Sequence, residues 1–337
     1  MAESESEGDT AAGIPAGLRA ALLNCVPQRK DAWTTPPPQG NRPRRSRRPR
    51  PDARAGAWPL RRAARRHRAR PGARRHPDRD AHQGESLDEL LGFVEAMQEG
   101  AARVAAPTGP RTVVLPTFNG ARKQANLMPL VAMLLAREGI PVLIHGRHDF
   151  DSRISPFELF DALELPVARN VDDAGQRLAS DRLAILPTEV IHPGLDAMMA
   201  LRPRMGLRNS SHSVAKLLDP LPSRSVRVVA VTHPEYVDSM GEALPQLSAD
   251  DGRALLMRAS EGEAYLHLRR KAHLQGFANG QGLDLNPASN EDLDWPLSPA
   301  CEPAANADFI RAILAGAEPL PPRIADQISA LRRLATA

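Results

Sequence analysis

Residues 112–146 read TVVLPTFNGARKQANLMPLVAMLLAREGIPVLIHG and decide the fold of this 337-residue chain. The β-branched run Thr112–Leu115 is stopped by a proline, and Leu127–Arg137 then carries apolar residues at helical spacing. A second apolar run, Pro141–Ile144, predicts a buried strand. Strand, helix and strand in this order form one βαβ unit, which predicts a parallel α/β sheet.

The loop between the first strand and the helix, residues 116–126, lies at the carboxyl edge of such a sheet and opens at a helix N-terminus. Free backbone N–H groups and the helix dipole attract phosphates at that place. The loop contains one glycine, Gly120, and two adjacent cations, Arg122 and Lys123. The pattern favours a phosphate-binding loop; the alternative is that both cations are solvated surface charge.

Elements on both sides of this unit extend the α/β pattern. Ser86 and Glu89 have the spacing of a capping box before an amphipathic helix, and a second such helix begins at Ser155. Further strands are expected at 183–186, 226–231 and 254–257, further helices at 195–201, 213–218, 236–244, 308–314 and 322–334, and a long loop at 275–305. The predicted fold class is therefore α/β, with a mostly parallel central sheet flanked by helices and a small helical N-terminal domain.

Charge is distributed unevenly along the chain. Residues 28–80 hold 18 Lys and Arg against 4 Asp and Glu, whereas residues 81–337 carry a net charge of −7. The basic pI of about 9.5 therefore reflects one segment, not the predicted folded part. Cys25 and Cys301 lie far apart, which indicates neither a disulfide framework nor a zinc site and fits a cytoplasmic protein. No export signal or membrane span is expected.

The basic segment has two interpretations. Residues 42–80 are dominated by Arg, Pro and Ala without an apolar period, which is typical of a disordered arm that binds phosphates. The interpretation we favour is that this segment is translated out of frame. When the standard codons for residues 76–83 are read from their second base, they permit the sequence of an apolar helix. The predicted domains are a basic low-complexity segment at 1–83, the last helix of a helical domain with its linker at 84–106, and an α/β domain at 107–337.

Several ordered blocks resemble the anthranilate phosphoribosyltransferase family, glycosyltransferase family 3. The blocks are Gly84–Met97, His145-Gly146, Phe160–Leu163, His192-Pro193 and Met205–Arg208 with Asp219–Leu221, in consistent order over 84–335. The chain is most similar to a non-biosynthetic branch of that family, the YbiB branch, which is regarded as DNA-binding. The resemblance implies a homodimer built through the helical domain, here weakened because most of that domain is disrupted.

Three departures from the family's motifs bear on activity. The family's pyrophosphate loop, Gly-Thr-Gly-Gly-Asp, corresponds to Pro116–Gly120, and its Lys-His-Gly-Asn corresponds to Ile144–Arg147. Its magnesium-holding Asp-Glu pair corresponds to Ala264-Tyr265, behind Glu261 and Glu263, which we expect to be surface carboxylates. We therefore expect no catalytic residues, no metal site and no cofactor.

The sequence favours a sequence-nonspecific nucleic-acid-binding protein that holds backbone phosphates. The phosphate-binding candidates are Asn119, Arg122, Lys123, His145, Arg147 and Arg208. For His145, which follows a buried strand, the alternative is a satisfied core histidine. The alternative function is a phosphoribosyltransferase that acts on an aromatic or nucleobase-like acceptor, with magnesium and phosphoribosyl pyrophosphate as cofactor and substrate. The basic runs at 202–208 and 269–271 either line a groove or face solvent.

Overall fold

A computed structural model describes residues 85–147, 153–205, 210–297 and 302–337. The predicted basic segment at 1–83, both cysteines and the candidate Arg208 lie outside these residues.

The strands are β1 (Thr112–Thr117), β2 (Val142–Gly146), β3 (Leu183–Pro187), β4 (Ser225–Val231), β5 (Arg253–Ser260), β6 (Glu263–Leu266), β7 (Leu274–Ala278) and β8 (Gln281–Asp284). The longer helices are α3 (Leu87–Glu99), α4 (Met128–Arg137), α5 (Pro156–Ala162), α6 (Val171–Ser180), α8 (Pro193–Met199), α11 (Pro234–Leu247), α12 (Pro303–Leu314) and α13 (Pro322–Thr336). The short helices are α7 (Thr188–Ile191), α9 (Arg202–Met205), α10 (Ser211–Val214) and the 3₁₀ turn η1 (Ala215–Leu217).

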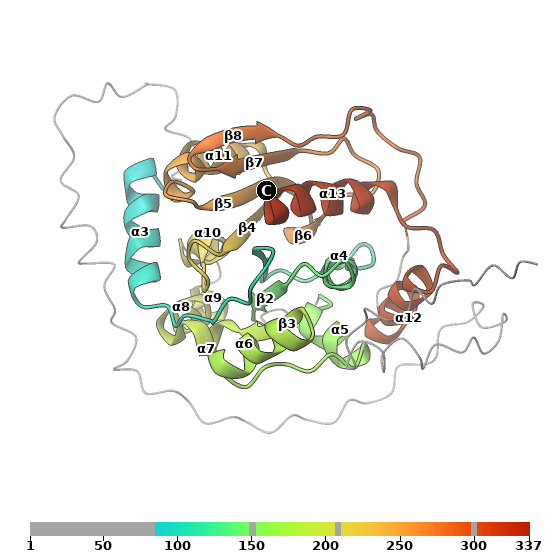
Figure 1. Cartoon of the computed structure of the whole chain (residues 1–337), viewed down its shortest axis with the longest axis horizontal. Helices are drawn as coiled ribbons and strands as arrows, with labels where there is room; N and C mark the ends of the chain where they lie inside the picture. The colour runs from blue at the N-terminus through green and yellow to red at the C-terminus, as the bar shows by residue number, and fades with distance from the viewer. Residues whose placement is uncertain (1–84, 148–152, 206–209, 298–301) are drawn as a thin grey trace, which may run out of the picture.

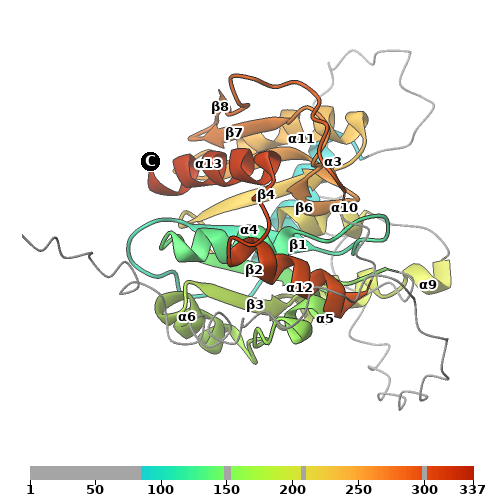
Figure 2. The ribbon, with the colours of Figure 1, turned by 90° about the vertical axis from the view of Figure 1, so that its right-hand side faces the viewer.

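The strands form one eight-stranded sheet in the order β3-β2-β1-β4-β5-β7-β8, with β6 paired to β5. The five strands from β3 to β5 run parallel, and β6, β7 and β8 are antiparallel to their neighbours. Figure 2 shows β8 and β7 at one end of the molecule and β3 with α6 at the other. The predicted α/β fold with a mostly parallel central sheet is confirmed.

Helices cover both faces of the sheet. One apolar cluster joins the sheet to α4, α5, α12 and α13, and a second joins it to α3, α6, α8, α10 and α11. Figure 1 shows α3 and α12 at opposite sides of the molecule. Because both faces are covered, β1, β2 and β4 are buried along their whole length and are mostly apolar, with Arg227 of β4 and His145 of β2 as buried exceptions.

Both predicted capping boxes are present. The hydroxyl of Ser86 accepts the backbone N–H of Glu89, whose carboxylate accepts the N–H of Ser86, and Ser155 with Glu158 forms the same reciprocal pair. Each motif satisfies backbone donors that the first helical turn leaves without a partner. The helices α3 and α5 therefore begin where the sequence predicts.

Two expectations from the sequence are wrong. The first strand does not stop at Pro116, because β1 continues to Thr117, which pairs with Gly146 of β2. The predicted loop at 275–305 contains the β7–β8 hairpin, which turns at Asn279 and Gly280 with φ of 50° and 76°. Positive φ at two successive residues is the signature of a type I′ turn, for which Asn-Gly is the preferred sequence.

Candidate functional site

The carboxylate of Glu263 lies inside the predicted phosphate-binding loop. Its Oε1 accepts the backbone N–H groups of Asn119 at 2.9 Å and Gly120 at 2.8 Å, and its Oε2 accepts the hydroxyl of Thr117 at 2.6 Å. The side chain is fully buried. Glu263 therefore occupies the N–H groups that a bound phosphate would use, and the expectation that it is a surface carboxylate is wrong.

A second carboxylate closes the rest of the loop. Glu261 accepts the backbone N–H of Lys123 at 2.9 Å and that of Arg122 at 3.2 Å from either oxygen. The side-chain amide of Asn119 donates to the carbonyl of Gly262 at 2.9 Å, so the β5–β6 turn and the loop are bound together at both ends. A Cβ on Gly262 would lie 2.5 Å from the amide nitrogen of Asn119, which leaves room for glycine alone.

The cationic candidates separate into two groups. Arg122 and Lys123 are exposed beside the loop. Arg147, which follows β2 at the same edge of the sheet, turns to α8 and forms an ion pair with Asp196 at 2.7 Å. Arg147 also donates to the carbonyl of Asp196 at 2.7 Å, so its guanidinium is held by α8. Among the cationic candidates that the structure describes, Arg122 and Lys123 are exposed and Arg147 is partly buried.

His145 is fully buried, and its ring meets the ring of Phe118 edge-on with centroids 5.6 Å apart. Neither ring nitrogen has a hydrogen-bond partner in the part of the chain that the structure describes. Burial lowers the pKa of His145 to about 3, because the apolar surroundings disfavour the charged form. The imidazole is therefore neutral near pH 7, so His145 offers no positive charge to a phosphate at that pH.

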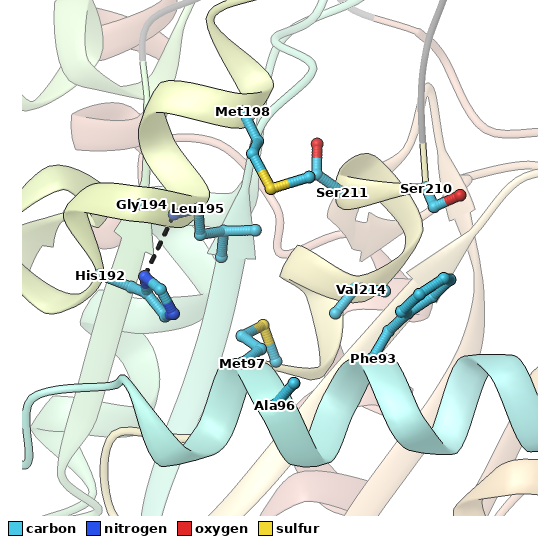
Figure 3. A pocket seen from close by; sticks show the side chains of 10 residues that line it. All are labelled: Phe93, Ala96, Met97, His192, Gly194, Leu195, Met198, Ser210, Ser211 and Val214. Atoms are coloured by element: carbon cyan, nitrogen blue, oxygen red, sulfur yellow. Dashed lines mark hydrogen bonds between the residues drawn. The ribbon is translucent and has the colours of Figure 1, made fainter. Parts of the chain in front are cut away.

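An apolar pocket lies between α3, α8 and α10 (Figure 3). Phe93, Met97 and Met198 line it, and the Nδ1 atom of His192 accepts the backbone N–H of Leu195 at 3.1 Å. Its volume is about 40 Å³. That space is far below the several hundred Å³ of a typical ligand site. The pocket is a packing gap between α3 and the helices α8 and α10.

The comparisons with known proteins agree with the fold. The chain is 34 % identical to the uncharacterized protein YbiB of Escherichia coli (strain K12) over 249 residues, which are 73 % of this chain and 77 % of that protein. It is 25 % identical over 241 residues to anthranilate phosphoribosyltransferase of Shouchella clausii (strain KSM-K16), which is 70 % of each chain. No family model matches the chain.

Solved structures give the same result. Anthranilate phosphoribosyltransferase from Thermus thermophilus is similar with a TM-score of 0.59 and 23 % identity, covering 75 % of this chain and 76 % of that one. The Saccharomyces cerevisiae enzyme in complex with PRPP and Mg gives 0.57 and 16 %, covering 72 % and 68 %. At these identities the structures establish the fold alone.

The sequence similarity to the curated proteins shows that the chain belongs to the anthranilate phosphoribosyltransferase-like family. Within that family, the resemblance to YbiB is confirmed by sequence.

In the described residues, no helix is both long and apolar enough to cross a bilayer.

Proposed function

We propose that this chain is a nucleic-acid-binding member of its family that holds backbone phosphates without sequence preference and carries out no phosphoribosyl transfer. One observation carries the part of the proposal that concerns phosphoribosyl transfer. The Glu263 carboxylate takes up the N–H groups of Asn119 and Gly120, where the family resemblance puts a pyrophosphate. A pyrophosphate entering the loop would meet a fixed negative charge in a space that is already filled.

The residues at the family's metal position do not fit magnesium. This ion needs oxygen ligands, usually carboxylates and substrate phosphates. The side chain of Ala264 has no ligand atom, and Tyr265 is fully buried, which raises the pKa of its hydroxyl. Within the described residues, no group of three or more His, Cys, Asp and Glu side chains is arranged to hold a metal. We therefore assign no step to a metal ion.

The cationic side chains of the loop lie on its outer side, where a phosphate that does not enter the loop can reach them. Arg122 and Lys123 are exposed, while their backbone N–H groups are held by Glu261. Because residues 81–337 carry a net charge of −7, affinity must come from local patches. We expect weak binding, with Kd on the order of 10⁻⁴ to 10⁻⁶ M, as is typical of nonspecific complexes.

The test is a salt titration with a 20-nucleotide oligothymidine and a chain that begins at Gly84, which omits the arginines of the basic segment. The logarithm of affinity should fall linearly with the logarithm of salt concentration, by about 0.7 per phosphate contact on a single strand. The Arg122→Ala/Lys123→Ala variant should reduce that slope by up to about 1.4. Absence of any binding, or turnover of phosphoribosyl pyrophosphate with an aromatic acceptor, would overturn the proposal.

We further propose that the chain works in the cytoplasm and forms a weakened homodimer. The family resemblance supplies the dimer, and the basic segment stands where the resemblance puts most of the dimerising domain. Light scattering across a hundredfold concentration range should find a dimer that dissociates at micromolar concentration. A dimer that persists throughout that range would contradict this part of the proposal.

A further inference from the structure

A second, basic pocket lies at the end of β5, just before the β5–β6 turn whose carboxylates fill the loop. It is lined by Arg258, Ala259, His267, Arg270, Lys271 and Asp292, and its volume is about 370 Å³. This volume is within the range of small-ligand sites. Three cationic side chains face one carboxylate there, although the folded part of the chain is acidic overall.

The charges of this pocket are not neutralised by its own residues. Among the described residues, Arg258 and Arg270 form no ion pair, and both are exposed. Lys271 pairs with Glu291 at 3.2 Å on the outer side, where both side chains are more than half exposed. An exposed pair of this kind is weak and readily exchanged.

The walls of the pocket are held in place before any ligand arrives. The buried side chain of Arg323 donates to the backbone carbonyl of Arg270 at 3.0 Å and to that of Glu291, and so ties the two walls together. The carboxylate of Asp292 accepts the backbone N–H of Lys271 at 2.8 Å. A pocket fixed in this way loses little conformational entropy on binding.

His267 lies among the cations of the pocket and adds a hydrogen-bond donor to it. The pKa of His267 is lowered first by burial and then by Arg270 and Arg269. The Nδ1 atom of His267 accepts the backbone N–H of Arg269 at 3.2 Å, so in the neutral ring Nε2 carries the proton and is a donor. Two guanidinium groups and one N–H donor suit a phosphate oxyanion.

We propose that this pocket binds a phosphate group of the nucleic-acid backbone, through Arg258, Arg270 and the Nε2–H of His267. The proposal rests on the proposed function and assigns the main contact to this pocket instead of the β1–α4 loop. A free polyphosphate offers the same oxyanion, so the experiment has to separate the two sources.

The experiment labels the arginines of the full chain with phenylglyoxal and reads each site by peptide mass spectrometry, so that the basic segment is scored separately. Oligothymidine of 20 nucleotides should protect Arg258 and Arg270 at concentrations that leave Arg169 labelled, because Arg169 lies at the opposite end of the sheet and is 86 % exposed. Tripolyphosphate is the second probe. Protection by tripolyphosphate without protection by the oligonucleotide would overturn the nucleic-acid assignment.

A matched pair of variants completes the test. In the full chain, Arg258→Ala/Arg270→Ala should reduce the salt slope for oligothymidine by up to about 1.4, and Arg169→Ala/Arg332→Ala should leave it unchanged. An unchanged slope in the pocket variant, with binding intact in the chain that begins at Gly84, would overturn this inference and leave the proposed function standing. Loss of all binding in that shorter wild-type chain would instead overturn the proposed function.

Discussion

The β1–α4 loop and the basic pocket lie along the same edge of the sheet. They differ in whether the chain's own carboxylates pair with their hydrogen-bond donors and cations. In the loop, backbone donors are matched by the chain's own carboxylates, Glu263 and Glu261, within 2.8–3.2 Å. In the pocket, Arg258 and Arg270 have no acidic partner among the described residues. An anion site inferred from fold position can thus be satisfied internally, whereas unmatched side-chain charge is visible only in the folded structure.

The largest expected effect on stability comes from removing the Glu263 carboxylate from the loop. Glu263→Ala leaves the N–H groups of Asn119 and Gly120 and the hydroxyl of Thr117 buried without their acceptor. The free energy of unfolding should fall by about 3–5 kcal/mol, because unmatched buried donors lose both water and partner. Urea denaturation measures the change.

The matched control for this variant is Glu261→Ala. The carboxylate of Glu261 is only half-buried, so its removal should lower the free energy of unfolding by about 1 kcal/mol. Equal losses for the two variants would mean that burial of Glu263 adds nothing, and the contrast between a filled loop and an open pocket would fail.

A smaller effect is expected from His145, which lies beside the filled loop. The unfolded chain takes up a proton near pH 6.5, whereas burial holds the pKa of folded His145 at about 3. Stability is therefore complete above pH 6.5 and is lost as the pH falls toward 3, at about 1.4 kcal/mol per pH unit. Between pH 6.5 and 5 the wild type should lose about 2 kcal/mol through this residue, and His145→Leu should remove that part of the loss.

Denaturation of both proteins at the two pH values measures the difference. His233→Gln is the control, because His233 is exposed. An acid sensitivity that His145→Leu leaves unchanged would contradict the account, and the half-buried histidines would then be responsible.

The smallest expected effect concerns the field inside the basic pocket. Arg270 contributes to lowering the pKa of His267, so Arg270→Ala should raise that pKa. A titration of the His267 ring signals by nuclear magnetic resonance measures the shift. Lys271→Ala is the control, since Lys271 is paired with Glu291. A His267 pKa that stays constant in the Arg270 variant would show that the pocket holds no concentrated positive field.

Local signals in the sequence were enough to predict much of the fold. The capping box at Ser86 and Glu89 and the β-branched run of β1 specify their elements within a few residues. The β7–β8 hairpin also has a local signal, the Asn-Gly pair at 279–280, which a loop-rich composition obscured.

The contacts of the site have no local signal. Glu263 and Asn119 are 144 residues apart, and they meet only because β6 folds back antiparallel on β5 beside β1. A Glu-Gly-Glu turn reads as surface charge until the sheet order is known. The basic pocket likewise requires the antiparallel return of the chain after β6, which brings Arg270 to the end of β5. The run of cations at 269–271 can be seen in the sequence, but only the folded structure shows that Arg258 lines the same pocket.

The Glu263 contact also constrains how such a protein can change over generations. Additional glycines in the loop would not free its backbone N–H groups while the carboxylate stays, and removing the carboxylate first would lower stability before any ligand could offset the loss. Effects at residues in contact are not additive, so the two changes are coupled. Each change is unfavourable alone, so a loop with free backbone donors can be reached from this sequence only when both changes occur together.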